Sequence, residues 1–275
     1  MEKDINNFSL VSVCIACYNA EHYIAEAIKS VLEQTYRNLE IIVCDDHSTD
    51  NTLEIVKSFK DHRITIYENP VNLGCSGNYN KSLSYATGVY VKLLCGDDMI
   101  APDCIEKQVN AFEANEGMHI VMVTGGKEII NRQGICLFEK KFPGKGFYEG
   151  KKAVRKSIFY GTNLFGEPGL PLMKTEVVRK TDGVGHKYCN DFELSCQVLL
   201  HGNLFVLSDV LFKFRILSTS ESAKAGWSQA KSVKSYFSFL YGQKVYGISR
   251  SLLFWGNSMV NLMTFARNLI FRFMT

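Results

Sequence analysis

The sequence predicts an α/β protein with a doubly wound, mostly parallel central sheet and a helical, amphipathic C-terminal tail. Three observations support this fold class. Apolar β-runs alternate with helix-like segments over about the first 110 residues, the connections between them are short, and residues 226–275 change to a basic and aromatic sequence. Strand–helix alternation with short connections is typical of parallel sheets, because each crossover helix returns the chain to the same end of the sheet.

Four strands and three helices are expected in the N-terminal half. Apolar β-runs indicate the strands, and apolar positions three and four residues apart indicate the helices. The expected strands lie in LVSVCIACYN, LEIIVCDD, RITIYEN and VYVKLL, and the expected helices in AEHYIAEAIKSVLEQ, NTLEIVKSFK and NYNKSLSYA. Ser48, Thr49 and Asp50 are candidate caps for the second helix.

The pattern is looser beyond residue 120. We expect a strand in HIVMVTGG, a glycine-rich loop in KKFPGKGFYEG, a helix in DFELSCQVLLHG and two short strands in NLFVLSDVLFKFRI. The helix is expected to end near Gly202, because glycine readily adopts the left-handed conformation that closes many helices.

The composition is that of a folded protein kept in a reducing compartment. Hydrophobic residues make up 46% and charged residues 21%, which excludes wholesale disorder. The N-terminal MEKDINNFSL lacks the basic start and apolar core of a secretory signal, so we expect a cytosolic location. Cys14 and Cys17 form a C-x-x-C, but side chains three residues apart on a strand face opposite ways, which disfavours a metal site.

Polar residues follow three of the expected strands at the point where each strand ends. They are Tyr18-Asn19, Asp45-Asp46 and Gly96-Asp97-Asp98. In open parallel sheets, ligands bind beyond the carboxyl ends of the strands. The sequence therefore predicts that these side chains converge on one binding site.

Each acidic pair has two interpretations. Asp97 and Asp98 repel each other, so they either cap the following helix or hold a divalent cation, Mg²⁺ or Mn²⁺, together with a diphosphate. Asp45 and Asp46 either cap the next helix or accept hydrogen bonds from a base or a ribose. No G-x-G-x-x-G follows the first strand and no P-loop motif occurs, which disfavours those two modes of nucleotide binding.

The first 110 residues or so resemble the N-terminal half of a family 2 glycosyltransferase with the A-type fold, and the similarity continues more loosely to about residue 220. It rests on the strand-end YN, on DDHSTD, on NLG and on the acidic loop CGDD at these spacings. No single one of these elements is specific, whereas their combination is.

The resemblance implies a donor site for a nucleotide-diphosphate sugar, with a UDP-sugar as the first expectation. The residues that would bind the donor are Ala16, Tyr18, Asn19, Asp46, Asn72, Asn80 and Asp97. Asp46 would bond the base. Asp97, which matches the last acid of the family's D-x-D signature, would bind the cation with support from Asp98. Mg²⁺ or Mn²⁺ at this position would neutralise the negative charge that develops on the leaving nucleotide diphosphate.

Three positions depart from the family pattern. Cys95 stands where the first acid of D-x-D is usual, and a thiol is a poor ligand for hard Mg²⁺. Tyr79 replaces the arginine that commonly precedes Asn80, and Leu217 replaces a late histidine. We therefore expect fewer protein ligands on the cation than is usual in the family, and a less certain dependence on metal.

Asp191 is the expected catalytic base. Its segment, NDFEL, precedes an apolar helical run, so Asp191 or Asn190 could also be a simple helix cap. The resemblance matches Asp191 to the general base of inverting enzymes, which takes the proton of the acceptor hydroxyl. Glu193 is expected to face the surface, and Glu167 is expected to be a solvated loop acid.

The C-terminal tail is basic and amphipathic. No acidic residue follows Glu221, and polar residues at Arg250, Asn257, Asn261, Thr264, Asn268 and Arg272 trace one stripe of a helix. This pattern predicts an interfacial helix that lies on an anionic membrane surface through residues 224–275. The alternative is a helix packed on the domain or across a dimer. Nucleic-acid binding is disfavoured, because phosphates offer nothing to a wide apolar face.

Together these observations predict an inverting glycosyltransferase, peripheral on the inner face of the cell membrane. The catalytic domain would span 1–220, with a donor half at about 1–110 and an acceptor half at about 111–220, followed by the tail at 221–275. A lipid-linked saccharide acceptor in bacterial surface polysaccharide synthesis is expected by analogy. The alternatives are a non-catalytic nucleotide-sugar-binding relative and a sugar nucleotidyltransferase, and a homo-oligomer is possible.

Overall fold

The structure, a computed structural model, describes residues 9–186, 188–217 and 221–274. The side chains at 221–224 and 269–274 also lie outside the described part. The polar N-terminal residues 1–8 and the side chains of Lys224 and Arg272, which entered the sequence-based expectations, are therefore not described.

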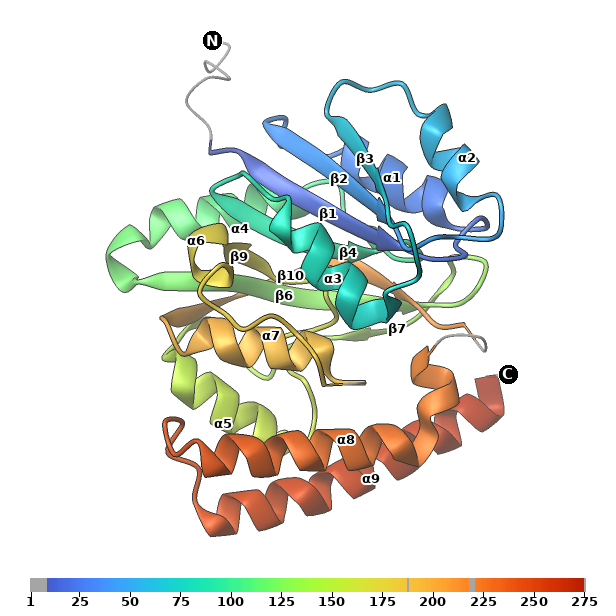
Figure 1. Cartoon of the computed structure of the whole chain (residues 1–275). Coiled ribbons are helices and arrows are strands. Elements are labelled where there is room, and N and C mark those ends of the chain that lie inside the picture. Colours follow the sequence, from blue (N-terminus) through green and yellow to red (C-terminus); the bar gives the residue numbers. More distant parts are fainter. Residues whose placement is uncertain (1–8, 187, 218–220, 275) are drawn as a thin grey trace.

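Ten strands of the described chain form one sheet, in the order β3-β2-β1-β4-β9-β6-β10-β5, with β7 beside β6 and β8 beside β10 (Figure 1). The first four strands pair in parallel, as expected, and are β1 (Val11–Cys17), β2 (Leu39–Asp45), β3 (Ile64–Glu68) and β4 (Tyr90–Cys95). The later strands are β5 (Met99–Ile100), β6 (Ile120–Ile130), β7 (Cys136–Lys140), β8 (Gly146–Tyr148), β9 (Leu172–Lys174) and β10 (Asn203–Arg215). β6 and β10 pair in parallel, and the remaining pairs are antiparallel.

Helices cover both faces of this sheet (Figure 1). They are α1 (Ile24–Leu32), α2 (Thr52–Ser58), α3 (Gly74–Ser84), α4 (Cys104–Ala114), the 3₁₀ turn η2 (Glu116–Met118), α5 (Gly150–Tyr160), α6 (Thr175–Val178), α7 (Asn190–Leu199), α8 (Glu221–Gly242) and α9 (Arg250–Met274). None of the three cap candidates is the N-cap of α2, which is Asn51 and has no capping side-chain hydrogen bond; Asp50, one residue earlier, accepts the Thr52 N–H with its Oδ1 at 2.9 Å.

Two hydrophobic clusters, one on each face, form the core. Alternate residues of β1 point to opposite faces, so Cys14 lies in the cluster with α5 and α7, and Cys17 lies in the cluster with α1 and α4. Both thiols are buried and free. The two thiols therefore face opposite sides of the sheet, as the sequence predicted.

Two expectations about the C-terminal half are wrong in detail. The segment NLFVLSDVLFKFRI forms the single strand β10, whose pairing with β6 is interrupted by register shifts between Val206 and Phe212. A bulge lets a strand bend without ending, so the polar Ser208-Asp209 did not mark a turn. The glycine-rich loop contains β8, which pairs with β10.

Lys92 connects the sheet to the segment that carries Glu167. It is fully buried on β4, and its Nζ donates to the carbonyl oxygens of Gly169 at 2.9 Å and of Leu170 at 3.0 Å. Burial lowers the pKa of this ammonium group. A buried lysine satisfied by carbonyls fixes the chain that supplies them, so residues 163–171 have a defined position beyond the sheet.

The tail packs against the domain as a helical hairpin beneath α5 and α7 (Figure 1). Close approach of α9 to α5 depends on two glycines, since a Cβ at Gly256 would lie 2.6 Å from the Ile158 oxygen and one at Gly161 would lie 2.5 Å from the Val260 nitrogen. Tyr236 and Phe237 of α8 are buried in the same cluster as the sheet. One flank of the hairpin therefore packs on protein, as the alternative interpretation held.

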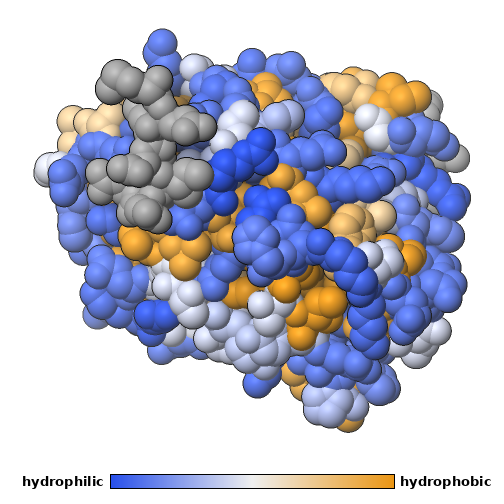
Figure 2. All heavy atoms as spheres, turned by 90° about the horizontal axis from the view of Figure 1, so that it is seen from above, coloured by the Kyte–Doolittle hydropathy of each residue, from blue (hydrophilic) through white to orange (hydrophobic). Residues whose placement is uncertain are grey.

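The other flank of α9 is apolar and exposed. Phe254 is 77% exposed, and Trp255, Leu262 and Phe265 are also exposed, whereas Thr264 of the expected polar stripe is buried. The face turned away from the tail shows mostly hydrophilic side chains, with apolar ones between them (Figure 2). Within the described residues, no helix has the length and hydropathy needed to cross a bilayer.

Candidate active site

The loops that follow β1, β2 and β4 meet at the carboxyl edge of the sheet. The Asp46 N–H donates to the Cys17 oxygen at 2.9 Å, and the Gly96 N–H donates to the Ala16 oxygen at 3.1 Å. The parallel register places all three strand ends at one level. The expected convergence of the polar loops is thus present.

Asp46 is a buried carboxylate with one oxygen in use. Its Oδ1 accepts hydrogen bonds from Asn69 Nδ2 and from the Leu73 N–H, both at 2.9 Å. Asn69 in turn donates to Asn78 Oδ1 at 3.1 Å. No described residue donates to Asp46 Oδ2, so this oxygen is oriented and available to a ligand.

Tyr18 and Asn19 form the rim of the same edge. Tyr18 is exposed, and Asn19 has a φ of 47°, a conformation that asparagine tolerates better than most residues. Asn19 Oδ1 accepts the Thr49 N–H at 2.8 Å, which joins the loop after β1 to the loop after β2.

Asn72 and Asn80 hold loops with their side-chain amides. Asn72 Nδ2 donates to the main-chain oxygen of Asp46 at 3.2 Å. Asn80 Nδ2 donates to the Val184 oxygen, and its Oδ1 accepts the Val184 N–H, both at 2.9 Å. Their contact with a nucleotide stays a prediction, and the structure gives each a second role in loop positioning.

Asp97, Asp98 and Cys95 form a compact cluster between β4 and β5. One potential ligand atom from each lies within 4.8 Å of the others. Burial raises the pKa of Asp97 and raises that of Asp98 further, with the charge of Asp97 adding to the effect on Asp98. A divalent cation would offset this repulsion, and carboxylate oxygens are the ligands that Mg²⁺ and Mn²⁺ prefer.

Cys95 does not suit such a cation. Burial raises the pKa of its thiol well above the usual range, which keeps it neutral, and its Sγ lies 3.0 Å from Tyr79 Oη in a hydrogen bond. Two of the three departures from the family pattern are therefore partners. The chemistry of the donor set fits a cation held by Asp97 and Asp98, with the thiol contributing little.

Arg215 ties this acidic loop to its surroundings. It lies at the end of β10 and is 1% exposed. Its main-chain N–H donates to Asp98 Oδ1 at 2.9 Å, and its side-chain Nε donates to the main-chain oxygen of Asp97 at 3.0 Å. Its Nη2 contacts Glu26 Oε2 at 2.5 Å, and its guanidinium lies 4.6 Å from the centre of the Tyr23 ring. One side chain thus links β10, the acidic loop and α1.

Asp191 lies on the first turn of α7. Its Oδ2 accepts a hydrogen bond from Asn163 Nδ2 at 2.8 Å. Burial, followed by the negative charge of Glu167, raises the pKa of this carboxyl. A carboxylate with a raised pKa accepts a proton more readily at neutral pH, as a general base must.

Glu167 and Lys127 stand between the two groups of acids. They form an ion pair, and the charges of both residues act on Asp98 and on Asp191. The expectation that Glu167 is a solvated loop acid is therefore wrong. Lys92 holds the following residues Gly169 and Leu170 to the sheet, and Glu167 pairs with Lys127 of β6.

Glu193 is not on the surface either. It is buried, and its Oε2 accepts the N–H groups of Gly185 at 2.7 Å and His186 at 2.9 Å. His186 Nδ1 also lies 2.5 Å from Glu193 Oε1. Since the loop before α7 folds back over the helix, the face that carries Glu193 is covered, and the residue holds this loop in place.

Sequence reasoning missed Lys127, Asn163 and Arg215. Lys127 and Arg215 are charged residues inside strand-like apolar runs, and such residues are rarely buried unless they are paired. Their positions within apolar runs could have indicated buried, paired charges. Asn163 gave none, because an asparagine in a loop is ordinary.

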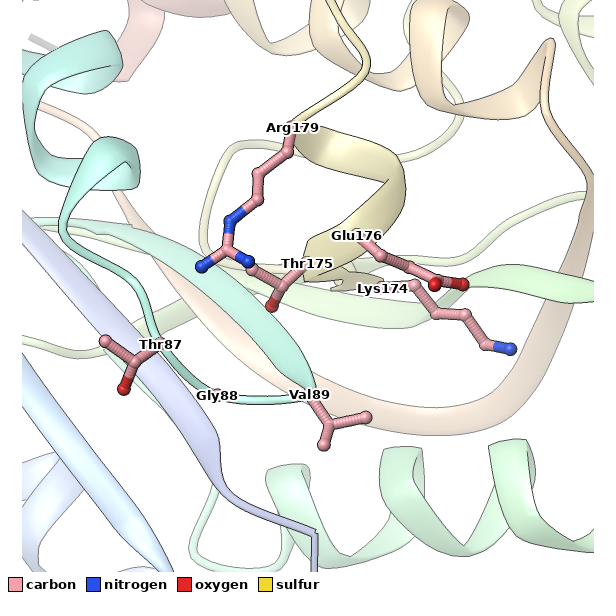
Figure 3. A pocket seen from close by; sticks show the side chains of 7 residues that line it. All are labelled: Thr87, Gly88, Val89, Lys174, Thr175, Glu176 and Arg179. Atoms are coloured by element: carbon pink, nitrogen blue, oxygen red, sulfur yellow. The ribbon is translucent and has the colours of Figure 1, made fainter.

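A separate pocket of about 360 Å³ opens away from these residues, where β4 and β9 meet α6. Figure 3 shows Arg179 and Thr175 on one side of it and Thr87 on the other. None of the predicted site residues lines it. This pocket is therefore not part of the candidate active site.

Comparison with known families gives a match over most of the sheet. A family model described as glycosyl transferase family 2 matches residues 12–166. An uncharacterized glycosyltransferase of Haemophilus influenzae is 31% identical over 238 residues, which cover 84% of this chain and 72% of that protein.

A more specifically named relative matches over a shorter stretch. It is the Escherichia coli UDP-Glc:alpha-D-GlcNAc-diphosphoundecaprenol beta-1,3-glucosyltransferase WfgD, 41% identical over 126 residues, or 46% of this chain. The aligned part spans about half of that relative, 49% of its length.

A solved structure confirms the fold class. It is the mannosyltransferase PcManGT from Pyrobaculum calidifontis in complex with GDP-Man and Mn²⁺, with a TM-score of 0.64 over 97% of this chain and 77% of that one. At 18% sequence identity, this likeness concerns the fold alone.

We predict that Arg215→Met lowers the free energy of unfolding by about 3–5 kcal/mol, because it leaves buried acceptors without their cation. Glu26→Gln should lower it by about 1 kcal/mol or less, because the Glu26 side chain is 52% exposed and water can replace its partner. Urea unfolding at pH 7 measures both. Equal losses in the two variants would contradict the role assigned to Arg215.

Proposed function

Because the chain belongs to glycosyl transferase family 2, we propose that it is an inverting glycosyltransferase that moves a sugar from a nucleotide-diphosphate donor to an acceptor hydroxyl. The observation that carries this proposal is the joined pair of acidic groups. Asp97 and Asp98 stand on the donor side, Asp191 stands on the acceptor side, and the charges of Lys127 and Glu167 act on both.

The residues have separate tasks in this reaction. Asp46 would accept a hydrogen bond from the base of the donor through its available Oδ2. Asp97 and Asp98 would hold Mg²⁺ or Mn²⁺, which when bound neutralises charge on the departing diphosphate. Asp191 would take the proton of the acceptor hydroxyl as its oxygen attacks the anomeric carbon from the side opposite the diphosphate. A single displacement of this kind inverts the configuration.

Asn163 and Glu167 tune the base in opposite directions. The hydrogen bond from Asn163 lowers the pKa of Asp191, and the charge of Glu167 raises it. Lys127 neutralises part of the Glu167 charge. Asp191 therefore remains ionisable although it is buried, which a general base requires.

We further propose a UDP-sugar donor and a lipid-linked saccharide acceptor, in bacterial surface polysaccharide synthesis. The name of the Escherichia coli relative supports both classes, since it states UDP-Glc as donor and a diphosphoundecaprenol-linked acceptor. Donor binding is assigned to about residues 1–110, acceptor binding to about 111–220 and a separate role to 221–275.

We propose that residues 221–275 attach the protein to the inner face of the cell membrane. Phe254, Trp255 and Phe265 are exposed on α9, and the basic residues Lys231 and Arg250 are exposed on the same hairpin. Aromatic side chains at the acyl boundary with basic ones among anionic head groups are typical of interfacial helices. A peripheral location would bring Asp191 to a lipid-linked acceptor.

Calorimetric titration of UDP and GDP, with and without Mn²⁺, tests the donor site. UDP should bind only with the metal, and Asp97→Ala should weaken binding about tenfold or more, a loss of at least about 1.4 kcal/mol. Asp61→Ala is the control, because Asp61 pairs with Arg63 on the surface. Binding that ignores the metal would show that Cys95 marks the loss of the cation site, and no binding of either nucleotide would refute the donor assignment.

The pH dependence of kcat/KM tests the base. Activity should fall as the pH drops through the raised pKa of Asp191, because the protonated carboxyl cannot accept a proton. Asn163→Ala removes a donor that stabilises the carboxylate, so the acid limb should move to higher pH by up to about one unit. Asn115→Ala, at the end of α4, should leave it in place. An unmoved limb in the Asn163 variant would argue against Asp191 as the base.

Sedimentation with lipid vesicles tests the tail. The protein should bind phosphatidylglycerol vesicles more than phosphatidylcholine vesicles, and salt should weaken this binding. The double variant Phe254→Ser/Phe265→Ser should reduce the bound fraction severalfold, since each exposed aromatic contributes apolar area to the contact. Val89→Ser, an exposed apolar position outside the tail, is the control. Equal binding by both variants would exclude this surface.

A further inference from the structure

Three basic residues from distant parts of the chain gather beside the acceptor side of the site. Lys127 of β6 and Lys140 of β7 are direct cross-strand partners. The positive charge of Arg267, from α9, also acts on the Lys140 ammonium group. We call Lys127, Lys140 and Arg267 the cationic cluster.

The cationic cluster carries more positive than negative charge. Glu167 pairs with Lys127, but within the described residues no carboxylate lies within ion-pair distance of Lys140 or Arg267. Like charges directly opposite each other on paired strands destabilise a sheet. The neighbouring Lys141, by contrast, has Glu139 at 3.1 Å. The arrangement therefore suits an anion that the protein itself does not supply.

Lys140 is in a position to meet such an anion. Every residue of β7 is exposed, yet enough protein surrounds the Lys140 ammonium group for desolvation to lower its pKa, and the charges of Lys127 and Arg267 lower it further. The Lys140 side chain is therefore accessible to an anion.

Arg267 provides a positive charge that no described carboxylate pairs with. Its Nη1 donates to Gln229, and its Nη2 donates to the Gly226 oxygen at 3.1 Å, which fixes the guanidinium against α8. Its Nε is buried and has no hydrogen-bond partner. Burial without a counter-ion also lowers the pKa of this group. A partly buried cation without a counter-ion is costly, and an anion bound nearby would offset the charge of the guanidinium.

The cluster adjoins the expected catalytic base. The charges of Lys127 and Glu167 both act on Asp191, and the charge of Glu167 also acts on Lys140. An anionic group bound here would lie on the acceptor side. On α9, the helix that supplies Arg267, the exposed Phe254 and Phe265 form the proposed membrane surface.

We propose that Lys140, Arg267 and Lys127 bind the diphosphate of a lipid-diphosphate-linked saccharide acceptor. The proposal rests on the proposed function, whose acceptor class it narrows. The donor also has a diphosphate, but that group would meet Asp97 and Asp98, which are acids and need a cation to bind it. The cationic cluster can bind a diphosphate directly through charge-assisted hydrogen bonds.

The test compares two soluble acceptor analogues on protein saturated with UDP and Mn²⁺, so that the donor site is filled. One is a short-chain alkyl diphosphate ester of N-acetylglucosamine, and the other is the neutral short-chain alkyl glycoside of the same sugar. Calorimetry should show tighter binding of the diphosphate by about tenfold or more. Lys140→Ala should remove most of this preference, and Arg267→Gln, which removes the charge of the guanidinium, should reduce it partly.

Lys141→Ala is the matched control, because it removes the adjacent lysine, which has its own partner in Glu139. The preference should survive in this variant. A preference that is absent in the wild type, unchanged in Lys140→Ala, or lost equally in Lys141→Ala would overturn the proposal. UDP binding is measured separately in each variant. A failure of UDP to bind would reject the donor assignment, and the two analogues would still report on the cationic cluster.

Discussion

A fully buried guanidinium organises the carboxyl edge of the sheet. Arg215 at the end of β10 is hydrogen-bonded to the acidic loop, contacts Glu26 of α1 and lies over the Tyr23 ring. A guanidinium taken out of water must keep such partners, since losing them leaves an uncompensated charge. The acidic loop, α1 and the end of β10 are therefore held in one arrangement.

Buried acids and one nearby lysine set the electrostatic environment of the candidate site. Asp97 and Asp98 have raised pKa values because they are buried and close together, and Asp191 has a raised pKa because it is buried near Glu167. The positive charge of Lys127 acts on both Asp98 and Asp191 and lowers the pKa of each. Adding a cation at the acidic loop would also change the electrostatic environment of Asp191, since these charges lie in a poorly solvated region where electrostatic interactions are strong.

The tail has two flanks with different surroundings. Its inner flank shares a hydrophobic cluster with the sheet and contacts α5 closely at Gly256. Its outer flank exposes aromatic residues such as Phe254. An exposed aromatic stripe on an otherwise well-packed helix is unfavourable in water, so its presence favours a binding role. Arg267 of the same helix donates to Gln229 and to the Gly226 oxygen of α8, and its positive charge acts on Lys140.

The sequence by itself determined the α/β class, the parallel direction of the first four strands and the convergence of the polar loops, because strand–helix alternation and the polarity of a parallel sheet are local properties. It could not determine where Glu167 and Glu193 point, that β10 is one bulged strand, or that the departures Tyr79 and Cys95 are hydrogen-bonded to each other. Each of these depends on contacts between residues far apart in the chain. Only the tertiary structure decided them, since burial and pairing of a charge are set by what packs over it.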